Sequence, residues 1–526
     1  MSSSMTNSQM AASSSRPLLQ PALSAGTGRT SYGQILKSST LIGGSSLLNT
    51  AIGIVRTKAF AVLLGPAGFG LFSLFSSIAS LTQNIASVGI NSSGVRQIAA
   101  AVGSDDTVRI AQTAAALRRT SFVLGVLGAA LLIIFSGPIS ILTFGTAEHA
   151  GTICLLSVAV LFQLISSGQT ALIQGMRRIG DLAKMGVLGA LFGTLMSIPL
   201  VYYFRENGVV LSLIAVAAMT IVTSWWYSRK IQVEVPSMTF RQVSQEVTAL
   251  LKLGFAFMIS GLVALGIAYA VRVFVLRHAG FAAAGLYQAA WTLGGFYVGI
   301  ILQAMGADFY PRLTAVIHDH PVCNRLVNEQ ARISLLLAGP GIIATLTFAP
   351  LVIALLYSTE FGGAVGVLRW ICLGAALQVI TWPMGFIVLA KGRAGLLVFC
   401  EVAWGIVSLC LAWLCVGYLG LDGAGVAFFG SYLFHIVLIY PIVHWLSGFT
   451  WSAENRHTGT LFVLSIATVF CAFQLLPPPW ASAIGTLVAA LSAFYSFRVL
   501  TKLVPWDEIP QPVRRLFVAM RICRTS

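Results

Sequence analysis

The chain has 526 residues, of which 57% are hydrophobic and only 9% charged, and its formal net charge is +16. Its mean hydropathy is +0.86. This composition excludes a soluble globular protein, in which about 25% of residues are charged, and it predicts a polytopic membrane protein. Basic loops that contact anionic lipid headgroups account for the positive charge. We therefore expect a bilayer with an anionic inner leaflet as the partner surface, and no nucleic acid.

The apolar runs predict an all-α membrane protein with about 14 transmembrane helices, because one crossing needs about 20 apolar residues. The runs are continuously apolar and lack the alternation of barrel strands. In chain order they lie near 36–64, 69–95, 120–144, 152–175, 185–204, 208–228, 248–277, 281–309, 333–357, 364–390, 395–418, 424–446, 460–476 and 480–500.

The spans and the segments between them predict six parts. These are a disordered cytoplasmic tail at 1–33, a first lobe of six spans at 34–228, a cytoplasmic linker at 229–247, a second lobe of six spans at 248–447, a helical hairpin at 448–500, and a basic cytoplasmic tail at 501–526. With the amino terminus inside, only Arg205, Arg277 and Arg369 of the 32 Lys and Arg residues fall in outer connections. Cytoplasmic loops retain Lys and Arg, so both termini are predicted to be cytoplasmic.

The two lobes are predicted to be copies of each other, offset by about 215 residues. Arg56 then matches Arg272 to within one residue. Other positions that agree at this offset are Gly65 with Gly280, Gln163 with Gln378, Arg178 with Arg393, and Gly208 with Gly423. Each copy has an even number of spans, so both enter the membrane from the same side. In transporters built from such parallel repeats, the substrate path runs between the lobes.

The first lobe carries a basic residue, Arg56, within an apolar span. An arginine at the centre of a membrane helix costs roughly 2.5 to 3.5 kcal/mol and so indicates a cavity, a partner or an anionic ligand. No Asp or Glu precedes Asp105. Ser45 and Asn49 share the helix face of Arg56. We expect Arg56 to bind an anion, and the alternative is that its side chain extends to the lipid interface.

Polar residues in the second span extend the predicted cavity wall. They are Ser76, Ser80, Gln83, Ser87 and Asn91. Ordinary helix packing, in which Ser and Asn bond across an interface, is the alternative explanation.

The second lobe offers a sparser set of candidates around Arg272. Its expected cavity-lining residues are Tyr269, Gln288 and Gln303. Arg56 and Arg272 each precede a glycine turn by eight or nine residues, which places both about 12 to 14 Å below the outer boundary.

Carboxylates within the spans are scarce, and two are candidates for coupling transport to an ion gradient. Glu401 is the better candidate, because Asp308 lies four residues before Arg312 and can form a local ion pair. No motif for nucleotide or metal chemistry occurs in a suitable context, and the cysteines show no metal-ligand spacing. The sequence therefore predicts neither a cofactor nor a metal site.

Three segments resemble a known family. Residues 53–72 read GIVRTKAFAVLLGPAGFGLF, residues 307–313 read ADFYPRL, and residues 417–425 read GYLGLDGAG. They are similar to the Wzx-type flippases of lipid-linked oligosaccharides, which belong to the multidrug/oligosaccharidyl-lipid/polysaccharide exporter superfamily. The resemblance covers roughly residues 31–447 and leaves out the amino-terminal tail and the hairpin.

The resemblance implies a transporter, not an enzyme, that moves an undecaprenyl-pyrophosphate-linked glycan across a bacterial inner membrane by alternating access. It implies a role in O-antigen, capsule or exopolysaccharide synthesis, with a polysaccharide polymerase and a chain-length regulator as candidate partners. It also implies a cationic central cavity, in which Arg56 matches the arginine of the first helix. A multidrug antiporter of the same superfamily is an alternative, although exporting cations usually requires carboxylates in the first lobe. A membrane-embedded glycan polymerase is a second alternative, but it should have a sizeable outer loop.

Overall fold

The computed structural model describes residues 28–104, 106–231 and 240–503, with the side chains of 28–42, 240–245, 303–308 and a few single positions left aside. Within these ranges the chain is helical. The helices are α1 (Gly28–Ser87), α2 (Ile90–Gly103), α3 (Thr107–Ile134), α4 (Ser136–Phe144), α5 (Ala150–Gly175), α6 (Ile179–Phe204), η1 (Arg205–Asn207), α7 (Gly208–Ser228), α8 (Phe240–Ala315), α9 (His320–Thr347), α10 (Ala349–Leu356), η2 (Thr359–Gly363), α11 (Ala364–Ala390), α12 (Ala394–Leu419), α13 (Leu421–Ser447), α14 (Ala453–Leu475) and α15 (Pro478–Leu503).

Parts of the predicted tails and linker, namely residues 1–27, 232–239 and 504–526, lie outside the described residues. Helix α1 begins at Gly28, ahead of residue 34, where the first lobe was expected to start.

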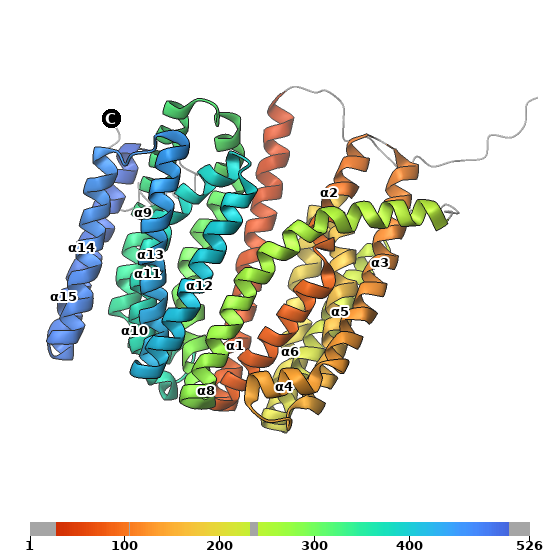
Figure 1. Cartoon of the computed structure of the whole chain (residues 1–526), viewed down its shortest axis with the longest axis horizontal. Coiled ribbons are helices and arrows are strands. Elements are labelled where there is room, and N and C mark those ends of the chain that lie inside the picture. Colours follow the sequence, from red (N-terminus) through yellow and green to blue (C-terminus); the bar gives the residue numbers. More distant parts are fainter. Residues whose placement is uncertain (1–27, 105, 232–239, 504–526) are drawn as a thin grey trace, which may run out of the picture.

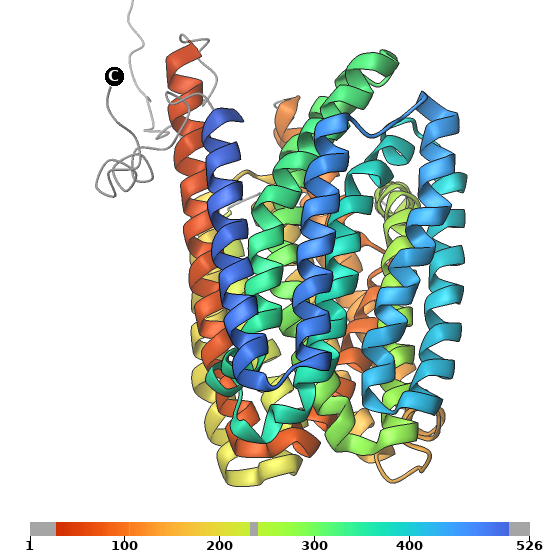
Figure 2. The same cartoon turned by 90° about the vertical axis from the view of Figure 1, so that its left-hand side faces the viewer.

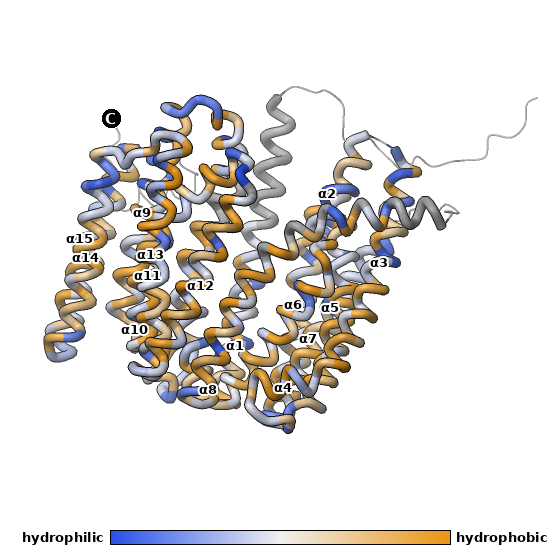
Figure 3. The backbone as a smooth tube through the Cα atoms, in the orientation of Figure 1, coloured by the Kyte–Doolittle hydropathy of each residue, from blue (hydrophilic) through white to orange (hydrophobic). Residues whose placement is uncertain are grey.

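The helices are long and apolar enough for a multi-pass membrane protein, which confirms the predicted fold class. Ten described stretches qualify as membrane spans, or up to eleven if the bent pair α9 and α10 counts as one. Hydrophobic residues cover most of their length (Figure 3). Three stretches have 45, 50 and 42 residues, well beyond the about 20 that one crossing needs. Each is interrupted, at Gly65, at Arg205–Asn207 and at Gly280. Each therefore suits two crossings, and the count of about 14 stays a prediction.

Two bundles of helices flank α1 and α8 (Figure 1). One apolar core joins the second half of α1 to α3, α5 and α7, and a second core is built mainly from α8, α9, α11, α12 and α13. Phe60, Ala61 and Phe69 of α1 belong to the second core. Helix α1 therefore contacts both bundles, which places Arg56 on a helix that runs between them.

Unusual backbone conformations recur at positions that the predicted repeat would pair. Gly65 has φ 63° and ψ −175°, and Gly280 has φ 85° and ψ 178°. Arg205 has φ 52° and ψ −127°, and Gly420 has φ 60° and ψ −135°. Arg205 adopts a positive φ although this conformation is strained for residues other than glycine. Both pairs are separated by 215 residues, the predicted offset, and the duplication itself stays a prediction.

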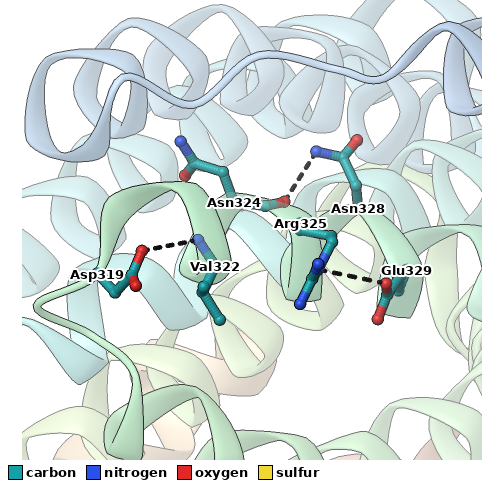
Figure 4. A network of polar contacts seen from close by, with 6 residues as sticks. All are labelled: Asp319, Val322, Asn324, Arg325, Asn328 and Glu329. Carbon is teal, nitrogen blue, oxygen red and sulfur yellow. Dashed lines mark hydrogen bonds and ion pairs between the residues drawn. The ribbon is translucent and has the colours of Figure 1, made fainter.

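The helical hairpin α14–α15 packs against α9, on the far side of the second bundle from α1 (Figure 1), and it faces the viewer in Figure 2. Polar side chains hold the beginning of α9 in place. Asp319 accepts a hydrogen bond from the Val322 amide at 3.1 Å, and Asn328 Nδ2 donates to the Asn324 carbonyl at 2.9 Å (Figure 4). The Asn455 side chain of α14 donates to the Asn328 carbonyl at 2.7 Å. The hairpin is thus attached to the bundle by hydrogen bonds as well as by apolar contact.

Candidate functional site

Arg272 lies in the first half of α8 and is held by the second half of the same helix. Its Nε donates to Gln288 Oε1 at 2.7 Å, and its Nη1 donates to the Ala268 carbonyl at 2.8 Å. Gln288 Nε2 in turn donates to Thr292 Oγ1 at 3.0 Å. The turn at Gly280 brings these segments together. Because its hydrogen-bond partners are neutral, Arg272 keeps its full positive charge and has a fixed orientation.

Arg56 lies in the first half of α1 and is half-buried. No hydrogen bond or ion pair joins it to any other residue that the structure describes. Phe60, one turn further on, is buried in the core shared with α8 and α11. A half-buried guanidinium in an apolar span needs water or an anion for its five donors. The geometry therefore suits an anionic ligand.

Two of the predicted cavity-lining atoms have no hydrogen-bond partner within the described parts of the chain. They are Asn49 Oδ1 and Ser76 Oγ, both buried. Buried polar atoms are normally paired with protein or water, so these two are candidates for contact with water or a ligand. Asn49 also lies beside Gly186 of α6. Ser45 and Gln83 are half-buried.

Three other predicted cavity-lining residues, Ser80, Ser87 and Asn91, are engaged within the first bundle. Ser80 Oγ donates to the Ser76 carbonyl at 2.8 Å and Ser87 Oγ donates to the Asn84 carbonyl at 3.0 Å. Asn91 Nδ2 donates to Ser167 Oγ of α5 at 3.2 Å. For Asn91 the contact agrees with the alternative explanation, in which polar residues of the spans bond across a helix interface.

The remaining candidates of the second lobe have different surroundings. The Tyr269 hydroxyl lies 2.5 Å from Thr143 Oγ1 of α4 and joins the two bundles. Glu401 of α12 is half-buried and has at least one contact of its own. The side chains of Gln303 and Asp308 lie outside the described residues.

The two bundles meet near the turns at Gly65 and Gly280, in a region that we call the closed end and define by Gly65, Gly70, Gly280 and Gly285. Helix α8 also meets the first bundle where Gly254 packs against Val88 and Gly89. The backbones approach so closely there that a Cβ atom on Gly70 would collide with the Phe281 carbonyl, and one on Gly285 with the Pro66 carbonyl. Aromatic rings also pack across this end. Phe69 lies 5.5 Å from Tyr357, and Phe144 lies 6.0 Å from Phe281, between ring centroids. By the predicted topology, the closed end faces outward.

Two basic residues link the bundles reciprocally at the closed end. Lys58 of α1 donates to the Leu355 carbonyl at the end of α10. Arg277 of α8 donates to the carbonyls of Leu142 at 2.8 Å and Thr143 at 3.1 Å, at the end of α4. Basic side chains stabilise helix carboxyl termini because the last carbonyls carry partial negative charge. Each lobe thus supplies a cation that caps a short helix of the other.

Replacing Arg277 with alanine is expected to weaken the closed end. A cation at an exposed helix terminus contributes about 0.3–1 kcal/mol, so the open population should rise up to about fivefold. The measurement is the rate at which an impermeant maleimide labels Ser358→Cys, in a chain without other cysteines. Ser358 suits this purpose because its Oγ is buried beside Tyr357. Arg325→Ala is the control, because Arg325 is highly exposed at the other end of α9. An unchanged labelling rate in Arg277→Ala would show that the cap does not hold the end closed.

Replacing Gln288 with glutamate is expected to inactivate Arg272 as an anion site. The carboxylate would take the 2.7 Å contact that the amide oxygen now makes and would neutralise the guanidinium. A hydrogen bond to a charged group is worth about 1.5–3 kcal/mol, so affinity for a pyrophosphate ligand should fall about tenfold or more. Gln288→Leu adds no charge, so its affinity for the pyrophosphate ligand should fall less than that of Gln288→Glu. Equal losses in the two variants would mean that charge at Arg272 is not what binds the ligand.

Three features escaped the sequence analysis. Lys58 caps α10, a contact that the sequence analysis did not predict. Tyr269 was expected in the cavity, but it bridges to α4. An aromatic cluster in the second bundle, described below, was not predicted, although its members on α8, Tyr287 and Trp291, are spaced one helical turn apart.

A protein-family model described as "Polysaccharide biosynthesis protein" matches residues 59–366, more than half of the chain. The chain belongs to this polysaccharide biosynthesis protein family. The matched region of this family member contains Arg272 and Gln288, whereas Arg56 lies three residues before it.

Curated and solved relatives agree with the family assignment. The lipid III flippase of Escherichia coli (strain K12) is 22% identical over 412 residues, which cover 77% of this family member and 97% of the flippase. The solved lipid II flippase MurJ, in an inward closed conformation, has a TM-score of 0.65 at 12% identity and covers 88% of this chain and 99% of its own. A MATE family multidrug resistance transporter of the MOP superfamily, in an inward-facing conformation, has a TM-score of 0.64 at 16% identity. The match covers 76% of this chain and 96% of the transporter. The fold is therefore that of the MOP superfamily transporters.

Proposed function

We propose that this chain is a flippase that moves an undecaprenyl-pyrophosphate-linked oligosaccharide across the bacterial inner membrane by alternating access. The family to which it belongs and its likeness to a lipid III flippase support this proposal. So does the fold, which is shared with a lipid II flippase. In this role the chain is a transporter and not an enzyme, and its product feeds the synthesis of a polysaccharide.

The observation that carries the proposal is the pair of arginines in membrane-embedded helices. Arg272 is oriented by Gln288, and Arg56 has no partner among the residues described. A guanidinium offers a planar fork that matches phosphate oxygens. Arg178 forms an ion pair with Asp181, and Arg325 forms one with Glu329. Neither of these pairs involves Arg56 or Arg272.

The proposed cycle begins with the closed end shut and with the lobes separating on the proposed cytoplasmic side, where Gly254 of α8 packs against Val88 and Gly89. The pyrophosphate binds Arg56 and Arg272, the glycan lies in the polar cavity, and the polyprenyl chain stays in the lipid. The lobes then rock, so that the contacts at Gly70 and Gly285 separate and the headgroup is released outside. Such rigid-body rocking around a central site is how parallel-repeat transporters alternate access.

Resetting the empty protein requires an energy source, and an ion gradient is the proposed one. Glu401 is the proposed coupling residue, because it is half-buried on α12 at a depth where a carboxylate is costly. Asp308 is the second candidate. A polysaccharide polymerase and a chain-length regulator are the proposed partners that would receive the flipped substrate. Both termini are proposed to be cytoplasmic, on the basic side of the protein.

The decisive experiment places the full chain in liposomes that contain a fluorescent polyprenyl-pyrophosphate-linked glycan in the inner leaflet. The rate at which the glycan becomes accessible to an added lectin measures flipping. Protein-free liposomes and Gln288→Glu serve as controls. Transfer no faster than in protein-free liposomes would refute the proposal.

A parallel assay tests the alternative that the chain is a multidrug transporter. The same liposomes are loaded with a lipophilic cation, and its efflux under a proton or sodium gradient is followed. Under the proposal we expect no efflux above that of protein-free liposomes, because two unneutralised arginines repel a cation. Cation efflux without glycolipid flipping would assign the chain to the multidrug transporters instead.

A further inference from the structure

The second bundle contains a cavity of about 300 Å³ between the two halves of α8 and helices α11, α12 and α13. Its size lies at the lower end of the range for small-molecule sites, about 300–1,000 Å³. Six aromatic side chains line it. They are Tyr287, Trp291, Trp382, Trp404, Phe428 and Tyr432.

Four of the aromatic rings form a continuous wall. Ring centroids lie 5.2 Å apart for Trp291 and Phe428, 5.0 Å for Phe428 and Tyr432, and 5.6 Å for Trp404 and Tyr432. These rings come from α8, α12 and α13. Each ring packs against its neighbour, so the wall presents adjoining aromatic surfaces to a ligand.

The wall also includes a polar donor that no described residue satisfies. Trp404 Nε1 is buried and lacks a hydrogen-bond partner. A buried tryptophan usually finds a partner for its N–H, and an orphaned donor costs about 1–3 kcal/mol. Gln378 and Ser408 line the same cavity. The cavity therefore combines aromatic faces with a few polar groups, one of which is an unsatisfied donor.

The cavity adjoins Arg272. Ala264 and Ala268 line it, and they precede Arg272 by eight and four residues, so all three share one face of α8. Arg272 Nη1 donates to the carbonyl of Ala268 itself. The guanidinium consequently stands at the edge of the cavity.

A sugar ring fits this combination best. The C–H faces of a pyranose stack on aromatic rings, while its hydroxyl groups accept and donate hydrogen bonds at the ring edge. A hydrocarbon chain would leave Trp404 Nε1 unpaired. An aromatic cation would suit the ring faces but would be repelled by Arg272.

We infer that the aromatic cavity is the subsite for the sugar ring next to the pyrophosphate of the transported lipid. This inference rests on the proposed function, and it assigns the pyrophosphate to Arg272 and the first sugar to the wall formed by Trp404, Phe428 and Tyr432. The subsite recognises the glycan itself and selects lipids by their headgroup. It lies inside one lobe, so it can travel with that lobe when the protein changes conformation.

The test compares two probes on the purified full chain by titration calorimetry. One is farnesyl pyrophosphate, and the other is farnesyl pyrophosphate that carries a single hexose or N-acetylhexosamine. Trp404→Phe removes the N–H and keeps an aromatic ring. It should weaken binding of the sugar-bearing probe about three- to tenfold, the value of one neutral hydrogen bond, and leave farnesyl pyrophosphate unaffected. Trp413→Phe is the matched control, because Trp413 lies on the same helix but is 57% exposed.

The outcomes separate the two proposals. A selective loss for the sugar-bearing probe supports the subsite. An equal loss for both probes, or no loss for either, overturns it. Failure of the proposed function would appear differently, because Arg272→Ala would then leave the binding of both probes unchanged.

Discussion

Replacing Arg56 with alanine is expected to abolish flipping of the lipid-linked glycan. In the proposed complex the guanidinium makes two parallel hydrogen bonds to a phosphate, and each hydrogen bond to a charged group is worth about 1.5–3 kcal/mol. Their loss should reduce affinity by about a hundredfold or more, since every 1.4 kcal/mol is a factor of ten. The lectin-accessibility rate in liposomes measures the effect.

Arg56→Lys separates charge from geometry. Lysine keeps the positive charge but has no planar fork, so the variant should transport more slowly than the natural chain and faster than Arg56→Ala. Arg109→Ala is the matched control, because Arg109 is an exposed arginine near the start of α3. Full flipping by Arg56→Ala would refute the anion-binding role. So would equal losses in Arg56→Ala and Arg109→Ala, which would indicate a non-specific effect of net charge.

The two arginines should respond differently to substitution. Arg56 has no partner in the described structure, so its removal takes away a ligand contact and leaves no orphaned group. Removal of Arg272 also leaves Gln288 Oε1 without its guanidinium donor. Part of any loss in Arg272→Ala would thus reflect a disturbed α8. Gln288→Glu avoids this problem because it preserves the shape of the site and changes only the charge.

The sequence predicted the features that depend on local pattern. Long apolar runs indicated the helices, and the glycines at 65 and 280 indicated the turns, which do adopt positive φ. Arg56 stood out because charge is costly inside a membrane helix. The contact between Arg272 and Gln288 spans only 16 residues, and the sequence predicts both as site residues, Arg272 from the repeat and Gln288 from the polar face of its span.

Features that depend on long-range packing could not be predicted in this way. Helical spacing gives the face on which a residue lies but not the helix that the face meets. Asn91 therefore looked like part of a cavity wall, although it binds Ser167, 76 residues further along the chain. Lys58 and Leu355 are 297 residues apart. The aromatic wall likewise combines residues from α8, α12 and α13, and no single span contains enough of it to be noticed.

Replacing Gly285 with alanine is the second change for which we expect a large effect, namely loss of transport through failure of the closed end to close. The added Cβ would collide with the Pro66 carbonyl and lie 2.9 Å from the Gly70 amide nitrogen. Both obstacles are backbone atoms, so no side chain can move aside. Such overpacking costs about 1–3 kcal/mol, which shifts a two-state equilibrium about 5- to 150-fold.

The predicted shift has a direction that labelling can test. Gly285→Ala should speed maleimide labelling of Ser358→Cys from the outer side and slow glycan flipping, because a lobe pair that cannot close outside cannot accept substrate from inside. Gly266→Ala is the matched control on the same helix, since no heavy atom lies within 4 Å of the Cβ position there. Slower flipping without faster labelling would mean that Gly285 acts through the stability of the protein. Faster labelling without slower flipping would mean that closure of this end is not part of the transport cycle.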